Sequence, residues 1–354
     1  MSQNWMRHFE LQLVDPDGGA IDLGSFKVTF NIDWFNLSSE TRIGTFKIYN
    51  LSANTVNRIM GNEFNRVRII AGYDGIAADV PANQVGVART VNPDEVWQMD
   101  GRNYGLIFDG EIRYTITGKD NPVDSFVLIQ AADSDRAFAT SITAQTLAAG
   151  YTVSDVNAVL MKDFNANGAT EGNTPAMPAT VFPRGRVLFG MTRHLMDNVA
   201  DQCKADWMFV DGKREMVAKN EVVHEAIKLN SATGLVGMPQ QTIGSGVNVR
   251  CLINPNIRVN GLIELNQASV FRTVLGNNDI AMTQGRITDQ NNNGNITIEG
   301  TTAQPASIAT DGVYIVRGIM YTGDTRGQAW YMDMMCEARG AADLVSSSAR
   351  ERGL

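Results

Sequence analysis

Alternating hydrophobic and polar residues recur in short segments along most of this 354-residue chain. Phe9, Leu11 and Leu13 alternate with polar residues, and the same period of two returns over 26–32 and 44–48. Because successive side chains of a strand point to opposite faces, this alternation predicts strands with one buried face. Further strands are predicted over 66–73, 106–116 and 125–132. Many short strands separated by polar turns favour a barrel or a sandwich.

Two local signals punctuate these first strands. Residues 15–19, Asp-Pro-Asp-Gly-Gly, predict a tight turn, since proline fixes φ and glycine tolerates positive φ. Ser52 is suited to cap the amino terminus of one short helix over 53–60, because its hydroxyl can accept a hydrogen bond from the first turn. The region up to residue 133 is therefore predicted to be mainly β.

A long irregular insertion over 74–104 interrupts the predicted strands. A loop of this length inside a compact domain is usually functional or disordered. Its apolar side chains lack barrel periodicity, and they predict a contact with a neighbouring protein, with a loop folded onto its own domain as the alternative. The candidate contact residues are Val80, Val85, Val87, Val91, Val96 and Trp97.

The pattern changes between residues 134 and 224 and predicts a small α+β module. Helices are expected over 134–147 and 154–164, followed by a linker rich in glycine and proline. A strand over 207–210 and one over 215–218 flank Asp-Gly, a strong hairpin signal. A third helix is predicted from the apolar face formed by Leu188, Met191, Leu195, Val199 and Cys203.

Strand periodicity returns after residue 229. Strands are expected over 247–251, 257–265, 312–320 and 329–338, with a polar, turn-rich stretch over 277–302. The sequence thus predicts a mainly β chain in which two strand-rich regions flank the α+β module. The predicted division is 1–133, 134–224, 225–338 and a carboxy-terminal tail over 339–354.

Composition excludes several classes of protein. The net charge is −8 and no basic run exceeds a pair, which argues against a nucleic-acid-binding surface. No stretch of 18 apolar residues and no signal peptide is visible, so we expect no membrane insertion. Cys203, Cys251 and Cys336 are far apart in apolar runs. They are expected to be buried, inert thiols of a protein assembled in the reducing cytoplasm of a bacterial host.

No motif for catalysis or for a cofactor is present, and the chain is predicted not to be an enzyme. The three histidines lie in unrelated segments, and neither a G-x-S-x-G motif nor a Walker A motif occurs. None of the many carboxylates sits in an apolar segment that would raise its pKa. Asp133 and Asp135 are instead expected to cap the helix that begins beside them.

One polar stretch resembles a calcium-binding loop. Residues 289–294 match the first positions of such a loop, but the acidic residue at its end, Glu299, comes one position early. Asparagine-rich turns give this spacing by chance, so a polar loop without a metal ion is the preferred interpretation.

Several segments resemble the baseplate hub proteins of phage tails. The most specific one ends in Gly-Met-Pro at 237–239, and the insertion over 74–104 is longer than is typical of the family. The segments are 48–52, 67–73, 106–112, 131–135, 229–239, 249–255 and 323–327.

The resemblance implies a structural virion protein of the contractile-tail type, similar also to the hub portion of type VI secretion spike proteins. Such a hub carries two tail-tube-like β-barrel domains and forms a homotrimer without cofactors. It adapts the six-fold tail tube above it to the three-fold central spike below, with other baseplate proteins around it. Phage DNA passes through its channel without specific binding.

Two alternatives remain open at this stage. One is a tail-associated peptidoglycan hydrolase, which is a different class of protein. The other is a hub or distal tail protein of a non-contractile tail.

Overall fold

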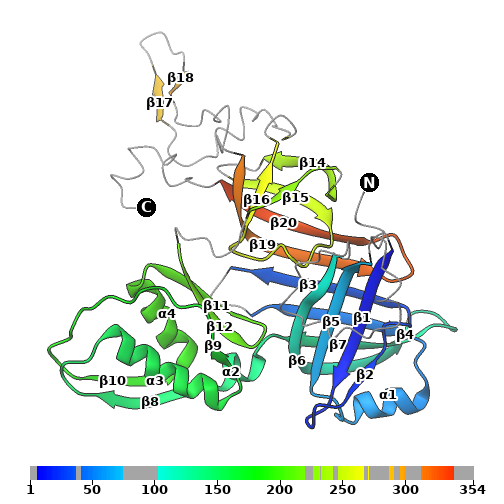
Figure 1. Ribbon diagram of the computed structural model, residues 1–354, viewed down its shortest axis with the longest axis horizontal. Coiled ribbons are helices and arrows are strands. Elements are labelled where there is room, and N and C mark those ends of the chain that lie inside the picture. The colour runs from blue at the N-terminus through cyan, green and yellow to red at the C-terminus, as the bar shows by residue number, and fades with distance from the viewer. Residues whose placement is uncertain are drawn as a thin grey trace, which may run out of the picture.

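The computed structural model describes residues 6–36, 41–74, 103–219, 226–231, 233–241, 246–266, 270, 287–290, 296–299 and 312–338. The chain is mainly β, with one compact group of helices and short strands beside a large sheet (Figure 1). This confirms the predicted mainly β architecture with an α+β module.

The first strand-rich region follows the predicted pattern closely. Ser52 Oγ accepts a hydrogen bond from the Thr55 backbone N–H (3.2 Å) and begins helix α1 (Ala53–Met60), as expected. The strands of this region are β1 (Arg7–Val14), β2 (Ala20–Asp22), β3 (Val28–Phe35), β4 (Ile43–Tyr49), β5 (Arg66–Tyr73), β6 (Asn103–Lys119) and β7 (Ser125–Ala132).

The second strand-rich region contains four strands that were not predicted, β13, β14, β17 and β18, and one predicted strand is much shorter than expected. The strand expected over 257–265 is reduced to its last four residues, because the preceding ones form turns in which Asn260 has a φ of 63°. A positive φ is incompatible with an extended strand. The strands are β13 (Ala226–Leu229), β14 (Leu235–Gln241), β15 (Gly246–Leu252), β16 (Leu262–Leu265), β17 (Ile287–Gln290), β18 (Ile296–Glu299), β19 (Val313–Asp324) and β20 (Trp330–Ala338).

One joint merges the two strand-rich regions into a single sheet. Strands β3 and β19 pair antiparallel from Gly318 opposite Phe35 to Asp324 opposite Thr29 (Figure 1). The order of hydrogen-bonded neighbours is β14-β15-β20-β19-β3-β4-β7-β6-β5-β1-β2, with β16 and β13 branching from β19. Both regions also share one continuous hydrophobic core. They are therefore mechanically coupled.

The turn between β19 and β20 reinforces this joint. The Thr325 N–H donates to the Val28 carbonyl (3.0 Å), while Thr325 Oγ1 accepts from the Val28 N–H (3.0 Å) and donates to the Phe26 carbonyl (3.1 Å). Arg7 donates to the carbonyl of Gly327 (2.7 Å). Segment 323–327 of the hub resemblance thus attaches the end of the chain to its beginning.

The α+β module has its own hydrophobic core. Residues expected to continue the first helix form β8 instead, which pairs with β10 from Met191 opposite Ile142 to Arg186 opposite Leu147. The helix predicted over 134–147 therefore ends early, at Thr140, and the helix predicted from Leu188 begins late, at Thr192. In both cases pairing between distant segments overrode local periodicity. The elements are α2 (Asp135–Thr140), β8 (Ile142–Leu147), α3 (Val153–Ala166), β9 (Thr170–Glu171), β10 (Arg186–Met191), α4 (Thr192–Gln202), β11 (Ala205–Val210) and β12 (Lys213–Ala218).

The three cysteines are unbridged, and burial raises the pKa of each thiol. Cys251 and Cys336 are buried as predicted, whereas Cys203 is partly exposed. Among the described residues, no helix is long and apolar enough to cross a membrane.

We predict that Thr325→Val destabilises the fold by about 1–3 kcal/mol, because the partly buried backbone N–H of Val28 then loses its hydrogen-bond acceptor. The matched control is Thr322→Val in β19, whose partly exposed side chain faces away from the core and should change stability by less than about 0.5 kcal/mol. Urea unfolding of both variants measures the difference. Equal stabilities for the two variants would show that the turn does not secure the joint.

Candidate functional site

The described residues offer surfaces and a buried junction as candidate sites. Within them, no group of three or more His, Cys, Asp or Glu could hold a metal ion. His8 lies on β1 and contacts Asp74 and Glu10, while His194 is exposed on α4. The three features with functional potential are one face of the large sheet, an ionic junction between the three parts of the chain, and an apolar ribbon of the module.

The first feature is the outer face of the large sheet, which lies opposite the shared core. Cross-strand partners share a face, so this surface can be traced through the register from β14 to β6. It runs without interruption across eight strands. Its residues include Val236, Gln240, Asn248, Arg250, Tyr331, Asp333, Met335, Met320, Thr322, Thr29, Asn31, Asp33, Thr45, Lys47, Tyr49, Phe126, Leu128, Gln130, Tyr114 and Ile116.

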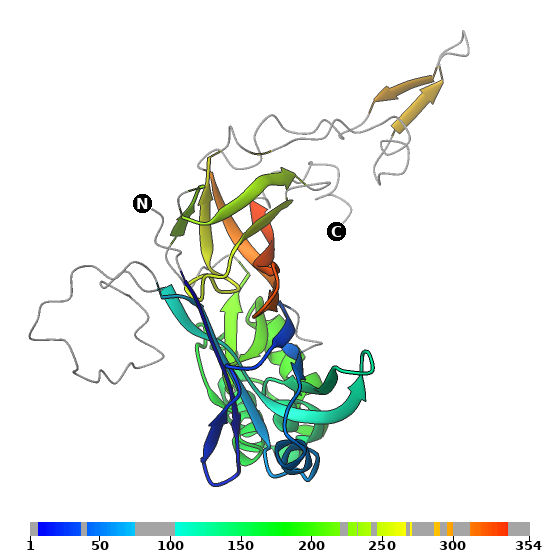
Figure 2. The same cartoon turned by 90° about the vertical axis from the view of Figure 1, so that its right-hand side faces the viewer.

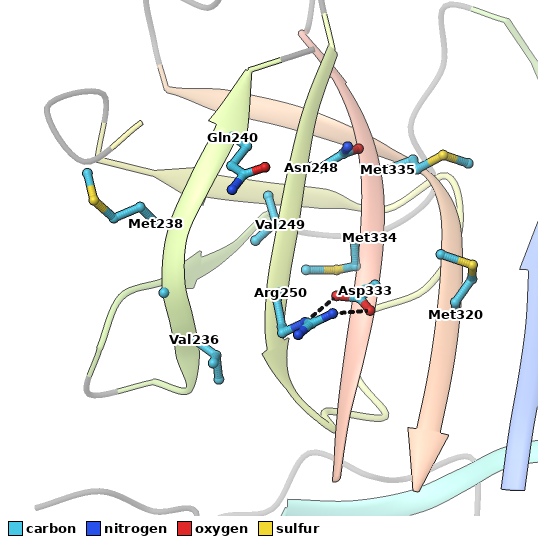
Figure 3. Close-up of a pocket in the computed structure, with 11 residues that line it drawn as sticks. Val236, Met238, Gln240, Asn248, Val249, Arg250, Met320, Asp333, Met334 and Met335 are labelled. Atoms are coloured by element: carbon cyan, nitrogen blue, oxygen red, sulfur yellow. Dashed lines mark hydrogen bonds and ion pairs between the residues drawn. The ribbon is translucent and has the colours of Figure 1, made fainter. Parts of the chain in front are cut away.

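Charged residues on the outer face are largely paired with one another. Arg250 donates to both carboxylate oxygens of Asp333, at 2.6 and 3.0 Å (Figure 3). Its guanidinium also lies over the Tyr331 ring. Lys47 donates to Asp120 (2.7 Å), and this hydrogen bond lowers the pKa of the Asp120 carboxyl. Acidic residues outnumber basic ones on the face, so its balance is negative. They are Asp33, Asp120, Asp324, Asp333 and Glu337 against Lys27, Lys47, Arg250 and Arg317.

The two ends of the outer face are more apolar than its centre. At the β6 end, Tyr114 and Ile116 are 44% and 51% exposed. At the β14 end, Val236 and Met238 are 39% and 60% exposed and border a shallow hollow (Figure 3). Exposed apolar side chains concentrated at sheet edges mark possible contact surfaces.

The second feature is a buried ionic junction centred on Asp133, at the end of β7. Arg42 Nη2 donates to Asp133 Oδ2 (3.1 Å) and also to Asp211 in the turn between β11 and β12. The backbone N–H groups of Asp211 and Gly212 donate to the Asp133 carboxylate (2.6 and 3.0 Å). Arg258, from the second strand-rich region, donates to Asp211 (3.2 Å). One carboxylate pair therefore links all three parts of the chain.

The charges of this junction are deeply desolvated. Burial raises the pKa of Asp133, although Arg42 opposes the shift. Burial also acts to raise the pKa of Asp211, but Arg42 and Arg258 outweigh it and lower that pKa. The guanidinium of Arg42 is buried over the rings of Trp34 and Phe108, 4.9 and 5.5 Å from their centroids.

The junction corrects two sequence predictions. Asp133 does not cap helix α2; it turns inward, fully buried, and Ser134 at the start of the helix makes no side-chain capping bond. Desolvated carboxylates were also not expected anywhere in the chain. Asp135 does lie in the first turn of α2, where Arg113 donates to it (2.8 Å). The local sequence could not reveal Asp133's role, since its partners lie about 80 and 90 residues away.

The third feature is an apolar ribbon formed by β8 and β10. Ile142, Val187 and Phe189 are 61%, 69% and 78% exposed on its outer side. Sequence analysis missed this surface, because Leu188 and Met191 were assigned to a helix. The alternation of Val187, Phe189 and Met191 is the signal that could have revealed it.

Three predictions fall wholly or partly outside the described residues, and the carboxy-terminal tail over 339–354 is one of them. The insertion residues Val80, Val85, Val87, Val91, Val96 and Trp97 also lie outside the described residues. The possible cation loop over 289–300 is described only at its flanks, where β17 and β18 pair antiparallel.

Comparison with known proteins places the fold. No family profile and no curated protein sequence matches the chain. Among solved structures, the 43 kDa tail protein of prophage MuSo2 from Shewanella oneidensis aligns with a TM-score of 0.52 at 6% identity, over 94% of this chain and 98% of that one. This chain has the fold of a phage tail protein. The resemblance to phage tail proteins is thus confirmed at the level of the fold.

Other tail-protein structures align more distantly. A tail protein from Neisseria meningitidis MC58 gives a TM-score of 0.49 at 9% identity, over 95% of this chain and 98% of its own. The E. coli c3393 protein, a type VI secretion component described as similar to T4 tail proteins gp27 and gp5, gives 0.45 at 7% identity, over 94% and 76%.

We predict that Asp133→Asn destabilises this tail-protein fold by about 3–5 kcal/mol, because it leaves Arg42 buried with a weakened partner set. The matched control is Asp135→Asn, two residues away, where the loss of a partly exposed ion pair should cost about 1 kcal/mol or less. Chemical denaturation compares the two. A similar loss in both variants would contradict a special role for the junction.

Proposed function

We propose that this chain is the structural baseplate hub of a phage tail, a trimer that caps the tail tube and adapts its six-fold symmetry to a three-fold central spike. The observation that carries the proposal is the end-to-end match to a prophage tail protein, which covers both strand-rich regions and the module. A hub of this kind acts by shape and contact, and it requires no catalytic residues.

An internal correspondence between the two strand-rich regions supports the trimer. Strands β3, β4, β5, β6 and β7 lie in the spatial order β3-β4-β7-β6-β5. Strands β14, β15, β16, β19 and β20 follow one another along the chain in the same way, and their spatial order is β14-β15-β20-β19-β16. All neighbours in both sets are antiparallel. One chain therefore offers two similar units, so that three copies offer six.

The two units also differ. β1 adds to β5 antiparallel, whereas β13 adds to β16 parallel. Similar units with different flanks are suited to a symmetry adaptor, which must present six like faces on one side and three on the other. Within one chain the sheet path is open from β14 to β2, so a closed barrel in this proposal arises from the assembled ring.

The outer face is the part of the sheet suited to line the DNA channel. The opposite face of the sheet is covered by the shared core, which leaves the outer face free. Its excess of acidic residues repels phosphates, and its internal ion pairs leave few cations to hold them. DNA can then slide past without being bound.

Other tail components occupy the remaining surfaces in this proposal. The tail tube lies above the ring, the central spike below it, and further baseplate proteins around it. The ribbon of β8 and β10, with Phe189 largely exposed, is one candidate contact, and the insertion over 74–104 is another.

Deleting residues 78–100 should leave the trimer folded but impair its incorporation into baseplates. Normal particles from the deletion would remove the insertion from the proposal.

The native mass of the purified chain tests the proposal. Light scattering after gel filtration should give three times 38.6 kDa, because a hub must close around the tail axis. A monomer or a hexamer would argue against the trimeric hub.

A zymogram addresses the alternative function, a peptidoglycan hydrolase. Cell-wall clearing that an acidic-to-alanine variant loses would support the hydrolase.

A further inference from the structure

The β8–β10 ribbon is an outer layer of the α+β module. Helices α3 and α4 contact the ribbon on one side and contact β9 and β11 on the other, so the module has three layers (Figure 1). Leu188 points into the helix layer and belongs to the core of the module. Ile142, Val187 and Phe189 point to the opposite side, and each is more than half exposed. This side of the ribbon is therefore an apolar surface directed away from the helices.

Strand β10 has the composition of a strand that is covered on both faces. The other outer layer of the module provides the precedent, because β11 is buried on both faces. Trp207 and Phe209 belong to the core of the module, whereas Met208 and Val210 belong to the core of the large sheet. Residues 187–191 of β10, Val-Leu-Phe-Gly-Met, are equally apolar on both faces. A near-continuous apolar run is typical of a doubly covered strand, so the outer side of β10 is suited to a covering layer.

The backbone of β10 also has a free edge. The Thr192 N–H donates to the Ser141 carbonyl (3.0 Å), and alternation along the ladder then makes Val187 and Phe189 members of non-hydrogen-bonded pairs. Their N–H and C=O groups point away from β8, and no backbone hydrogen bond joins them to any described residue. Residues 187–191 contain neither proline nor charge, the usual protections of a strand edge. This edge can therefore pair with an added strand.

Positive charge flanks the ribbon at both ends. Arg184 and Arg186 lie at the start of β10, and Arg193 lies just beyond its end. Residues 141–154 and 172–196, which include the whole ribbon, contain no Asp or Glu, although the net charge of the chain is −8. Arg193 donates to a backbone carbonyl, that of Phe138 (3.1 Å). The flanks thus present cations that favour carboxylates of a partner.

We propose that the β8–β10 ribbon is a strand-addition site for an extended segment of another tail protein. The segment pairs with the free edge of β10, and the domain that carries it packs over Ile142, Val187 and Phe189. Apolar side chains alternate along the segment, and Asp or Glu at its ends pair with the arginines that flank the ribbon. This inference rests on the proposed hub and defines the chemistry of one of its partners.

A second copy of the chain fits this edge poorly. Antiparallel pairing of β10 with β10 of another copy around Phe189 places Arg186 beside Thr192 of that copy, next to its Arg193. The same meeting of like charges occurs on both sides of the two-fold axis and opposes the contact. Two-fold pairing also produces even numbers of chains, whereas the proposed hub has three. A partner segment that ends in carboxylates turns this repulsion into attraction.

Photo-cross-linking in assembled particles identifies the occupant. The probe p-benzoylphenylalanine replaces Phe189, whose side chain is largely exposed in the isolated chain. Irradiation should join it to a different protein, and mass spectrometry of the adduct should show a peptide with alternating apolar residues between Asp or Glu. The control places the same probe at Gln145, which lies opposite Leu188 on the other face of the ribbon and should give no such adduct. An adduct between two copies of this chain would overturn the proposal.

Two variants separate strand pairing from apolar contact. Val187→Pro removes an outward N–H and preserves the pairing with β8, and Phe189→Asp places a charge on the apolar side. Each should reduce the yield of complete particles by roughly tenfold or more. Thermal unfolding of the isolated chain should hardly change, because the altered groups face solvent there. Gln145→Asp adds the same charge on the other face and should assemble like the wild type.

Charge reversal tests the arginines. Arg186→Glu should lower the particle yield, and replacing the acidic residue of the cross-linked peptide by Lys should restore it, because the ion pair is then re-formed with exchanged signs. Restoration by that Lys with wild-type Arg186 as well would show that the charges do not meet.

The outcomes separate this inference from the proposed function. A trimer that is present in the tail and assembles normally with both Val187→Pro and Phe189→Asp would overturn the strand-addition site while the hub stands. Loss of the trimer in purified Phe189→Asp would make the ribbon a contact between copies and overturn it too. A monomeric wild-type chain whose probe at position 189 still joins an acidic segment of another tail protein would support the site and count against the trimeric hub.

Discussion

The pairing of β3 with β19 is the constraint on which the rest of the structure depends. Seven residue pairs join a strand near the start of the chain to one near its end, and with them two separate strand-rich regions become one sheet with one core. The two strands lie far apart in the sequence. Bringing them together therefore closes a long loop, which costs conformational entropy. The turn that contains Thr325 and the side chain of Arg7 add further hydrogen bonds beside the joint, which help to offset this entropy cost.

The α+β module is fixed to this sheet by the ionic junction and by Met208 and Val210 of β11, which pack in the core of the sheet. The Asp133 carboxylate accepts hydrogen bonds from Arg42 of the first strand-rich region and from two backbone N–H groups of the module. Arg258, from the second strand-rich region, donates to Asp211 in the same junction. Buried ion pairs contribute little net stability because desolvation offsets attraction, but they penalise every arrangement that leaves a charge unpaired. The junction therefore defines the orientation of three parts that sequence separates. The proposed hub would depend on this fixed orientation, because it acts by shape and contact.

Sequence periodicity predicted individual strands well, but it predicted few of their neighbours beyond the β11–β12 hairpin, which the Asp-Gly turn revealed. The bounds of β5, β7 and α1 match the prediction, because one-sided burial and the Ser52 cap leave direct marks in the sequence. Alternation says which face a strand buries but not which strand lies beside it, so the β3–β19 joint could not be foreseen. The helix predicted from Leu188 begins only at Thr192, and Leu188 lies in β10, because a short apolar run fits both periods. The role of Asp133 was invisible for a similar reason, since Arg42 and the Asp211–Gly212 turn, which hold it in the junction, are distant in the chain.

In the proposed hub, three copies of this sheet surround the tail axis with their outer faces inward. A cryo-electron microscopy map of the assembled tail, resolved well enough to trace strands, tests it most directly. The account predicts three copies in one ring in line with the tail tube, with Asp33, Lys47, Arg250 and Asp333 facing the bore. A map with six copies, with the chain away from the axis, or with the outer face directed outward would contradict it.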